Sequence, residues 1–145
     1  ELRSSDVNIG GTTWKPEIPD MIRISDEVHN IMNQDTSITE KAITLMLFLM
    51  RSQIFYDGNK RVAQLAANQV MIQNGKGIIS IPVEHQEQFF VMLVKYYETN
   101  QMDEIKQFVY ESSVSGINFQ KKMDAKPVSK EEFYRKKVKP ISPKL

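Results

Sequence analysis

The stretch of residues 38–53 constrains the fold most strongly, because as a helix it is apolar on nearly every side. Its centre is the uninterrupted apolar run Leu45–Met50, and Ile43 comes just before this run. A helix without a polar face is usually buried among other elements, whereas a run this short cannot cross a bilayer. We therefore expect a helix at the centre of a helical core.

Two further patterns place the neighbouring helices. Residues 20–33 carry four apolar residues at spacings of three or four, which predicts an amphipathic helix: Met21, Ile24, Val28 and Met32. Ser37-Ile38-Thr39-Glu40 has the order of a capping box and predicts the start of the helix at 38. After the central helix, helical spacing resumes at residue 62 and continues to 72, where Asn74-Gly75 supplies a C-terminal cap.

The rest of the chain suggests two more helices, over 83–99 and 102–114, with a short strand-like stretch at 78–81. In the first 19 residues Val7 and Ile9 alternate with a polar residue before the turn Gly10-Gly11, which predicts a β-hairpin. We predict an all-α fold with a short N-terminal hairpin. The expected core comprises Met46, Leu49, Phe55, Leu65, Ala66, Phe90, Leu93 and Phe108.

Composition divides the chain into residues 1–19, a helical core over 20–117 and a Lys/Pro-rich tail over 118–145 with a short helix at 129–138. Residue 1 is Glu and not Met, so we expect a piece of a longer protein. The net charge of only +1 favours neither nucleic acid nor a membrane as partner. The absence of cysteine excludes disulfides and thiolate chemistry and fits a cytoplasmic location.

The segment that carries chemistry is Phe55-Tyr56-Asp57-Gly58-Asn59-Lys60-Arg61, between two apolar helices. A glycine turn that leads into a helix presents free N–H groups and the positive end of the helix dipole, which together attract anions. Arg61 can grip a phosphate with two hydrogen bonds, and Asp57 is an oxygen ligand suited to Mg²⁺. From the residues alone, an ordinary turn with solvated Lys-Arg charges fits equally well.

Residues 53–61 resemble the motif of the Fic family, His-x-Phe-x-(Asp/Glu)-Gly-Asn-(Gly/Lys)-Arg, at every specified position from Phe55 onward. Residues 10–19 are similar to the segment that follows the family's flap hairpin, and the resemblance covers about residues 5–117. It implies the C-terminal part of a Fic-type helical bundle, which transfers AMP from ATP to a Ser, Thr or Tyr hydroxyl of a target protein. A regulatory, antitoxin-like partner is compatible with the family.

The resemblance also implies roles for single residues. Phe55 would anchor the loop and Asp57 would hold Mg²⁺, while Gly58, Asn59, Lys60 and Arg61 would bind the phosphates of ATP. A flap at about residues 6–12 would hold the target segment by strand-like pairing, with Asn8, Ile9, Gly10, Gly11 and Thr12 as its contact residues.

Two departures from the motif bear on activity. The motif's His is the general base, and this chain has Gln53 in its place. A carboxamide cannot take up the proton of an attacking hydroxyl. Neither His29 nor His85 is an evident substitute, since each is expected to be a surface or helix-cap residue. The second departure is Gln64, where many members have another Arg; this feature resembles the Doc branch, which transfers phosphate instead.

Three functions therefore remain open. The first is an adenylyltransferase that is slow or inactive because Gln53 is not a competent base. The second is a non-catalytic module that binds nucleotide or protein. The third and least favoured is a Doc-like phosphotransferase.

Overall fold

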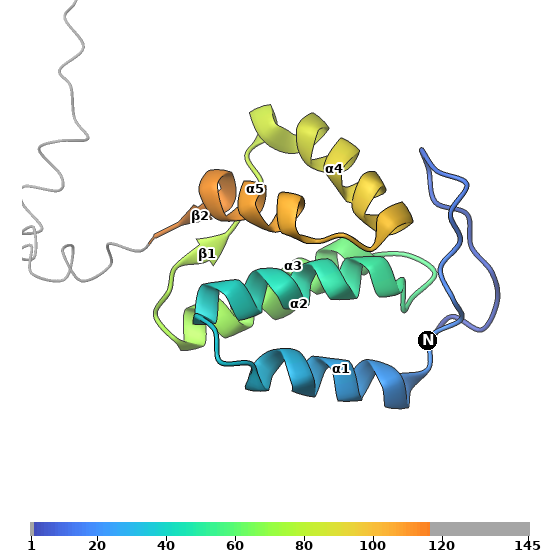
Figure 1. The fold of residues 1–145 in the computed structure, drawn as a ribbon, viewed down its shortest axis with the longest axis horizontal. Coiled ribbons are helices and arrows are strands. Elements are labelled where there is room, and N and C mark those ends of the chain that lie inside the picture. Colours follow the sequence, from blue (N-terminus) through green and yellow to red (C-terminus); the bar gives the residue numbers. More distant parts are fainter. Residues whose placement is uncertain (1, 117–145) are drawn as a thin grey trace, which may run out of the picture.

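The computed structural model describes residues 2–116, and these residues are mostly helical (Figure 1). Within these residues the predicted helices are all present, and each begins within three residues of its expected position. In chain order the elements are α1 (Met21–Asn33), α2 (Ile38–Ser52), α3 (Asn59–Gln73), β1 (Ile78–Ile79), the 3-10 turn η1 (Val83–His85), α4 (Gln86–Thr99), α5 (Asp103–Ser113) and β2 (Val114–Ser115).

Side chains cap the first two helices where the sequence predicts. Asp20 accepts a hydrogen bond from the N–H of Ile22 at 2.9 Å, and Ser37 Oγ accepts one from the N–H of Glu40 at 3.1 Å. In a capping box the Glu side chain would also accept a bond from the N–H of Ser37. Here the Glu40 carboxylate instead accepts a bond from Lys106 Nζ of α5 at 3.0 Å. The start of α2 is thereby tied to α5.

Helix α2 is central, as its apolar surface predicts. It lies between α1 on one side and α4 and α5 on the other (Figure 1), and it makes its most extensive contact with α3. The small side chains Ala63 and Ala67 of α3 are fully buried in that contact. The residues of α2 buried in the core are Ala42, Ile43, Leu45, Met46, Leu47 and Met50.

Part of the predicted core is wrong. Leu65 of α3 is 71% exposed and Phe90 of α4 is 44% exposed. The reason on α3 is that Ala63, Ala67 and Met71 face α2, which turns the larger residue Leu65 outward. Phe55 is half-buried rather than part of the core, and Ile54 beside it is the buried residue of the loop.

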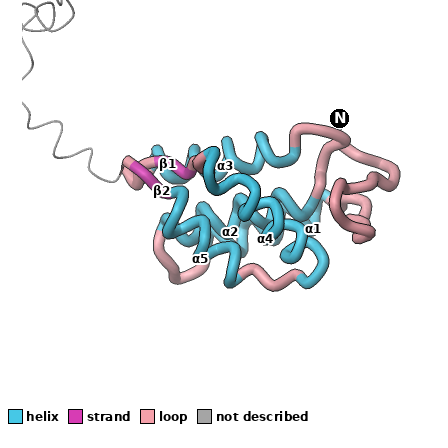
Figure 2. Tube along the Cα trace, turned by 90° about the horizontal axis from the view of Figure 1, so that it is seen from above, coloured by secondary structure: helices cyan, strands magenta, loops and turns pink. Residues whose placement is uncertain are grey.

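The expected N-terminal β-hairpin is also absent, since residues 2–20 form a turn at Gly10-Gly11 but no strand. The backbone N–H of Arg3 donates outside the segment, to Ile54 O at 2.9 Å. Pro16 and Pro19 have no N–H to donate to a ladder. Residues 2–20 gather at the end of the bundle opposite the strands (Figure 2).

The sheet found in the described part of the chain pairs β1 with β2, antiparallel, with Ile78 opposite Ser115 and Ile79 opposite Val114. Within residues 2–116, no helix has both the length and the hydropathy needed to cross a membrane. The predicted tail and its helix at 129–138 lie outside the described residues.

Candidate functional site

The loop between α2 and α3 is shaped by a left-handed residue at each end. Gln53 ends α2 with φ of 45°, and Gly58 precedes α3 with φ of 80°. Glycine adopts this conformation without strain, whereas for a residue with a Cβ it costs about 1–2 kcal/mol of free energy. The left-handed backbone at Gln53 must therefore be stabilised by its surroundings.

Asn59 supplies much of that stabilisation. Its side chain is buried and closes the loop on itself: Nδ2 donates to Phe55 O at 2.7 Å, and Oδ1 accepts from Phe55 N at 2.9 Å. A further bond from Nδ2 reaches Gln53 Oε1 at 3.2 Å. The carboxamide that the motif assigns to phosphate binding is thus already engaged inside the protein, and Asn59 offers its backbone N–H to a ligand.

The side chain of Gln53 also points inward. Its Nε2 donates to Met50 O at 2.6 Å, while its Oε1 accepts the bond from Asn59. Burial raises the pKa of the neighbouring Tyr97 phenol above its ordinary range, and a hydrogen bond with Gln53 offsets this only in part. The residue that replaces the His of the motif is therefore a neutral amide next to a neutral phenol.

The N-terminus of α3 is open. No side chain caps it, and the N–H of Gly58, just before the helix, donates to Asp57 Oδ1 at 2.6 Å. Arg61 Nη2 lies 3.4 Å from Asp57 Oδ2, and both side chains are highly exposed, at 78% and 93%. Lys60 lies to the side, with its Nζ 4.7 Å from the centre of the Phe90 ring. A free helix start beside an accessible guanidinium suits an anion.

The same end of α3 fits Mg²⁺ only when phosphate oxygens complete the coordination. Among residues 2–116 no group of three His, Asp or Glu side chains could hold a metal. Mg²⁺ is commonly bound through one or two carboxylates together with substrate phosphates. Asp57 offers one accessible carboxylate in that position.

Gln64 does not face this site. Its Nε2 donates to Ile79 O at 3.2 Å, and the same carbonyl accepts from Asn68 Nδ2 at 2.9 Å. Asn68 Oδ1 in turn accepts from Ile79 N at 2.7 Å. Gln64 and Asn68 therefore hold β1 against α3, and the side chain of Gln64 has a structural role.

Residues 1–71 match the model of the Fic/DOC family. This part of the chain belongs to the Fic/DOC family. No curated protein matches the chain. The matched Fic/DOC segment includes α1, α2, the loop of Gln53–Gly58 and all but the last two residues of α3.

The Fic/DOC segment contains a site residue that sequence reasoning missed, Arg3. It is 2% exposed, and its guanidinium donates to the backbone oxygens of Gln53 at 2.9 Å, of Ser5 at 2.7 Å and of Glu17. Arg3 thus ties the N-terminal segment to the first residue of the motif. Its only sequence signal was a charged residue in a segment without regular pattern.

The residues predicted to form a flap lie against α4. Ile9 packs on the core, and Gly11 lies near Val94, where an added Cβ would be 3.7 Å from Val94 Cγ2. Thr12 Oγ1 donates to Glu98 Oε1 at 2.5 Å, whereas Asn8 and Gly10 are exposed. The two ends of this region are fixed by Arg3 and by Trp14, whose ring lies 5.5 Å from that of Tyr97.

Tyr56, next to the loop's Asp57, is linked to the N-terminal segment through its hydroxyl. Ser4 Oγ and Ser5 Oγ lie 3.1 and 3.2 Å from Tyr56 Oη, and the Ser4 N–H donates to it at 3.0 Å. The hydrogen bonds with Ser4, followed by those with Ser5, lower the pKa of Tyr56 from 10.0 to about 8.

This shift predicts a pH-dependent stability. Because the phenol loses its proton at lower pH when folded than when unfolded, its contribution is fully present above about pH 10 and is lost as the pH falls through 8. The free energy of unfolding of wild type, measured in urea, should therefore increase relative to that of Tyr56→Phe between pH 8 and 10. Absorbance titration should also show the Tyr56 pKa rising in Ser4→Ala. Parallel pH profiles of wild type and Tyr56→Phe would contradict the assignment.

Proposed function

We propose that this Fic-domain protein binds Mg²⁺–ATP at the N-terminus of α3 and transfers AMP weakly or not at all. The observation that supports binding is the uncapped start of α3 beside the exposed guanidinium of Arg61. Helix N-termini of this kind bind phosphates through their N–H groups and dipole. ATP as the ligand agrees with a cytoplasmic location.

In this proposal several residues of the loop and of the first turn of α3 bind the phosphates together. The N–H groups of the first turn of α3 contact phosphate oxygens, and Arg61 adds charge-assisted hydrogen bonds. Gly58 provides the left-handed turn before them, since its own N–H is bonded to Asp57 Oδ1. Lys60 contributes positive charge from the side of Phe90. Asp57 is the side chain that would hold Mg²⁺, and the ion would neutralise negative charge on the phosphates.

The flap would bring the target. We propose that the exposed turn around Gly10, together with Asn8 and Thr12, contacts the protein segment that carries the Ser, Thr or Tyr hydroxyl. Arg3 holds the N-terminal segment beside the loop through Gln53 O at 2.9 Å, which supports a common site for flap and nucleotide.

Weak or absent transfer is inferred from Gln53. The attacking hydroxyl must lose a proton, and an amide has no basic lone pair near neutral pH. Both polar atoms of this amide are moreover engaged within the protein, with Met50 O and with Asn59 Nδ2. The alternative of a non-catalytic module that binds nucleotide or protein rests on the same contacts. A Doc-like phosphotransferase is the third possibility, because Gln64 leaves the terminal phosphate without a second Arg.

Two labelled nucleotides separate these functions. The protein is incubated with a lysate and ATP labelled at either the α- or the γ-phosphate. Protein labelling from the α position indicates AMP transfer, and labelling from the γ position alone indicates phosphorylation. No labelling from either, with nucleotide binding intact, indicates a binding module.

Binding itself predicts a thermal shift. A ligand that binds only the folded state at about 100 times its Kd stabilises that state by about 2.7 kcal/mol. We expect Mg²⁺–ATP to raise the Tm of wild type and to have a much smaller effect on Arg61→Ala. Arg23→Ala is the matched control, since Arg23 is also highly exposed (81%) and pairs with an aspartate at 3.7 Å, but on α1. Equal shifts in all three proteins would disprove the phosphate site.

A further inference from the structure

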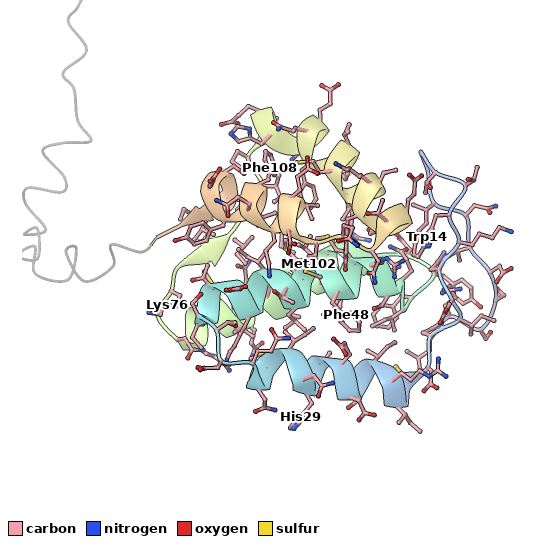
Figure 3. The ribbon with its side chains drawn as sticks, viewed as in Figure 1. Trp14, His29, Phe48, Lys76, Met102 and Phe108 are labelled. Carbon is pink, nitrogen blue, oxygen red and sulfur yellow. The ribbon has the colours of Figure 1, made fainter. Side chains whose placement is uncertain are left out.

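A second site lies apart from the phosphate loop. A cavity of about 740 Å³ opens between α1, α2 and the connector of residues 14–20. Phe48 lies between α2 and α1, and Trp14 lies by the N-terminal segment (Figure 3); both side chains line the cavity. The volume is in the range of small-molecule sites, about 300–1,000 Å³. Neither Asp57 nor Arg61 lines the cavity, so the proposed nucleotide site does not account for it.

The cavity is lined by a cationic side chain, Arg51, that is held in place and has no acid partner within residues 2–116. The guanidinium carbon of Arg51 lies 4.7 Å from the centre of the Trp14 ring, and its Nε donates to Tyr97 O at 3.2 Å. Among the described residues, none of the ion pairs involves Arg51. Stacking and one backbone bond thus fix a half-buried guanidinium whose remaining N–H groups can serve a ligand.

An unpartnered hydroxyl lies on the same face of α2. Thr44 Oγ1 is buried and has no hydrogen-bond partner within residues 2–116. Thr44, Phe48 and Arg51 follow one another at i, i+4 and i+7, so the hydroxyl is about 10 Å from Arg51 along the helix, with Phe48 between them. A buried polar group without a partner is unfavourable unless a ligand or water satisfies it.

The charges around the cavity favour a ligand with a single negative charge. Three basic side chains and three acidic ones line it: Lys15, Arg23 and Arg51 against Glu17, Asp20 and Glu27. Asp20 is paired with Arg23 at 3.7 Å. The remaining carboxylates at the rim would repel a phosphate or a polyanion more strongly than a monocarboxylate.

We propose that this cavity binds a small organic acid with one carboxylate on an apolar body. The carboxylate forms paired hydrogen bonds with the free N–H groups of Arg51, as guanidinium and carboxylate geometry favours. The apolar body contacts Phe48 and Ile31, and a polar group at its far end satisfies Thr44 Oγ1.

Trp14 makes the proposal testable without knowledge of the natural ligand. It is the chain's single tryptophan and it stacks on Arg51, so its fluorescence reports directly on this site. We would titrate the protein with 3-phenylpropionate and with 3-phenylpropanamide, which has the same shape without the charge. The acid should give a saturable change in fluorescence and the amide should not.

Variants of Arg51 and Thr44 test whether the fluorescence change comes from binding in this cavity. Arg51→Met should weaken binding of the acid by roughly 10–100-fold, the loss of a charge-assisted hydrogen-bond pair. Arg51→Lys should weaken it less, and inorganic phosphate should not compete. Thr44→Val, which keeps shape and removes only the hydroxyl, should retain binding of 3-phenylpropionate and serves as the folded control if Arg51→Met does not fold.

Three results would overturn the proposal: equal responses to acid and amide, no saturable response to the acid, or unchanged affinity in Arg51→Met. Binding of an amphipathic peptide with one Glu, while the free acid is silent, would likewise show that the cavity is a protein-docking groove and not a small-acid site. None of these readouts involves nucleotide, so the result is independent of the proposed transferase function.

Discussion

Replacing Gln53 by His should raise AMP transfer by about 10²–10⁴-fold, the usual contribution of a general base. The structure shows how the imidazole could be placed. Gln53 Nε2 donates to Met50 O, and an imidazole that donates its Nδ1–H to the same carbonyl would keep Nε2 as a free, basic lone pair. With an ordinary pKa of about 6.5, it would be largely neutral at pH 7. Histidine also tolerates the left-handed backbone found at residue 53 better than most residues.

The measurement is transfer of label from α-labelled ATP to the protein itself or to a lysate. Gln53→Asn is the matched control, because it keeps a carboxamide and should stay at the wild-type level. Combining Gln53→His with Arg61→Ala should abolish the gain if label arrives through the phosphate site. If Gln53→His stays silent while Mg²⁺–ATP still shifts the Tm, the domain lacks more than its base and is a binding module.

Removing the guanidinium of Arg3 should destabilise the protein by about 3 kcal/mol, because the Arg3→Met change leaves three backbone carbonyls without their donor. For a domain of this size the Tm should fall by roughly 10 °C. The loss should begin locally, since Arg3 joins the N-terminal segment to the loop. Trp14 fluorescence should therefore change at lower urea concentration than the helical circular dichroism signal.

Two variants bracket this result. Arg3→Lys keeps the charge but cannot reach three carbonyls with one ammonium group, and should lie between wild type and Arg3→Met. Arg23→Met removes an arginine that is 81% exposed and should change stability by less than about 1 kcal/mol. Comparable losses for Arg3→Met and Arg23→Met would mean that the buried contacts of Arg3 contribute nothing to the fold.

The helices were largely predictable because their signals are local. Asp20 and Ser37 cap α1 and α2 by binding N–H groups two or three residues away, and such spacings are visible in sequence. The exposure of Leu65 was not predictable, since α3 has apolar residues on several faces. The alanine face of α3 is the one that packs closely against the bulky side chains of α2. The orientation of α3 therefore depends on its partner helix and not on its own sequence alone.

The sequence motif was enough to propose the residues of the candidate site, but not to predict the contacts that they make. The motif points to the loop before α3, where the side chains of Asp57 and Arg61 are exposed. It did not reveal that the side chain of Asn59 would form hydrogen bonds within the loop, with the backbone of Phe55. Nor could it reveal Arg3, which lies in an irregular segment and donates a hydrogen bond to Gln53 O, 50 positions further along the sequence. Contacts to backbone oxygens leave no pattern of complementary residue types.

The contacts of Arg3 and Asn59 also bear on how such a domain changes over evolutionary time. Both side chains hold main-chain atoms of the loop: Gln53 O for Arg3, and the N and O of Phe55 for Asn59. Main-chain atoms are the same in every amino acid, so the loop can keep its shape when the side chain at position 53 is exchanged. A lineage could thus lose the catalytic base, or regain it, by a single codon change without first rebuilding the loop.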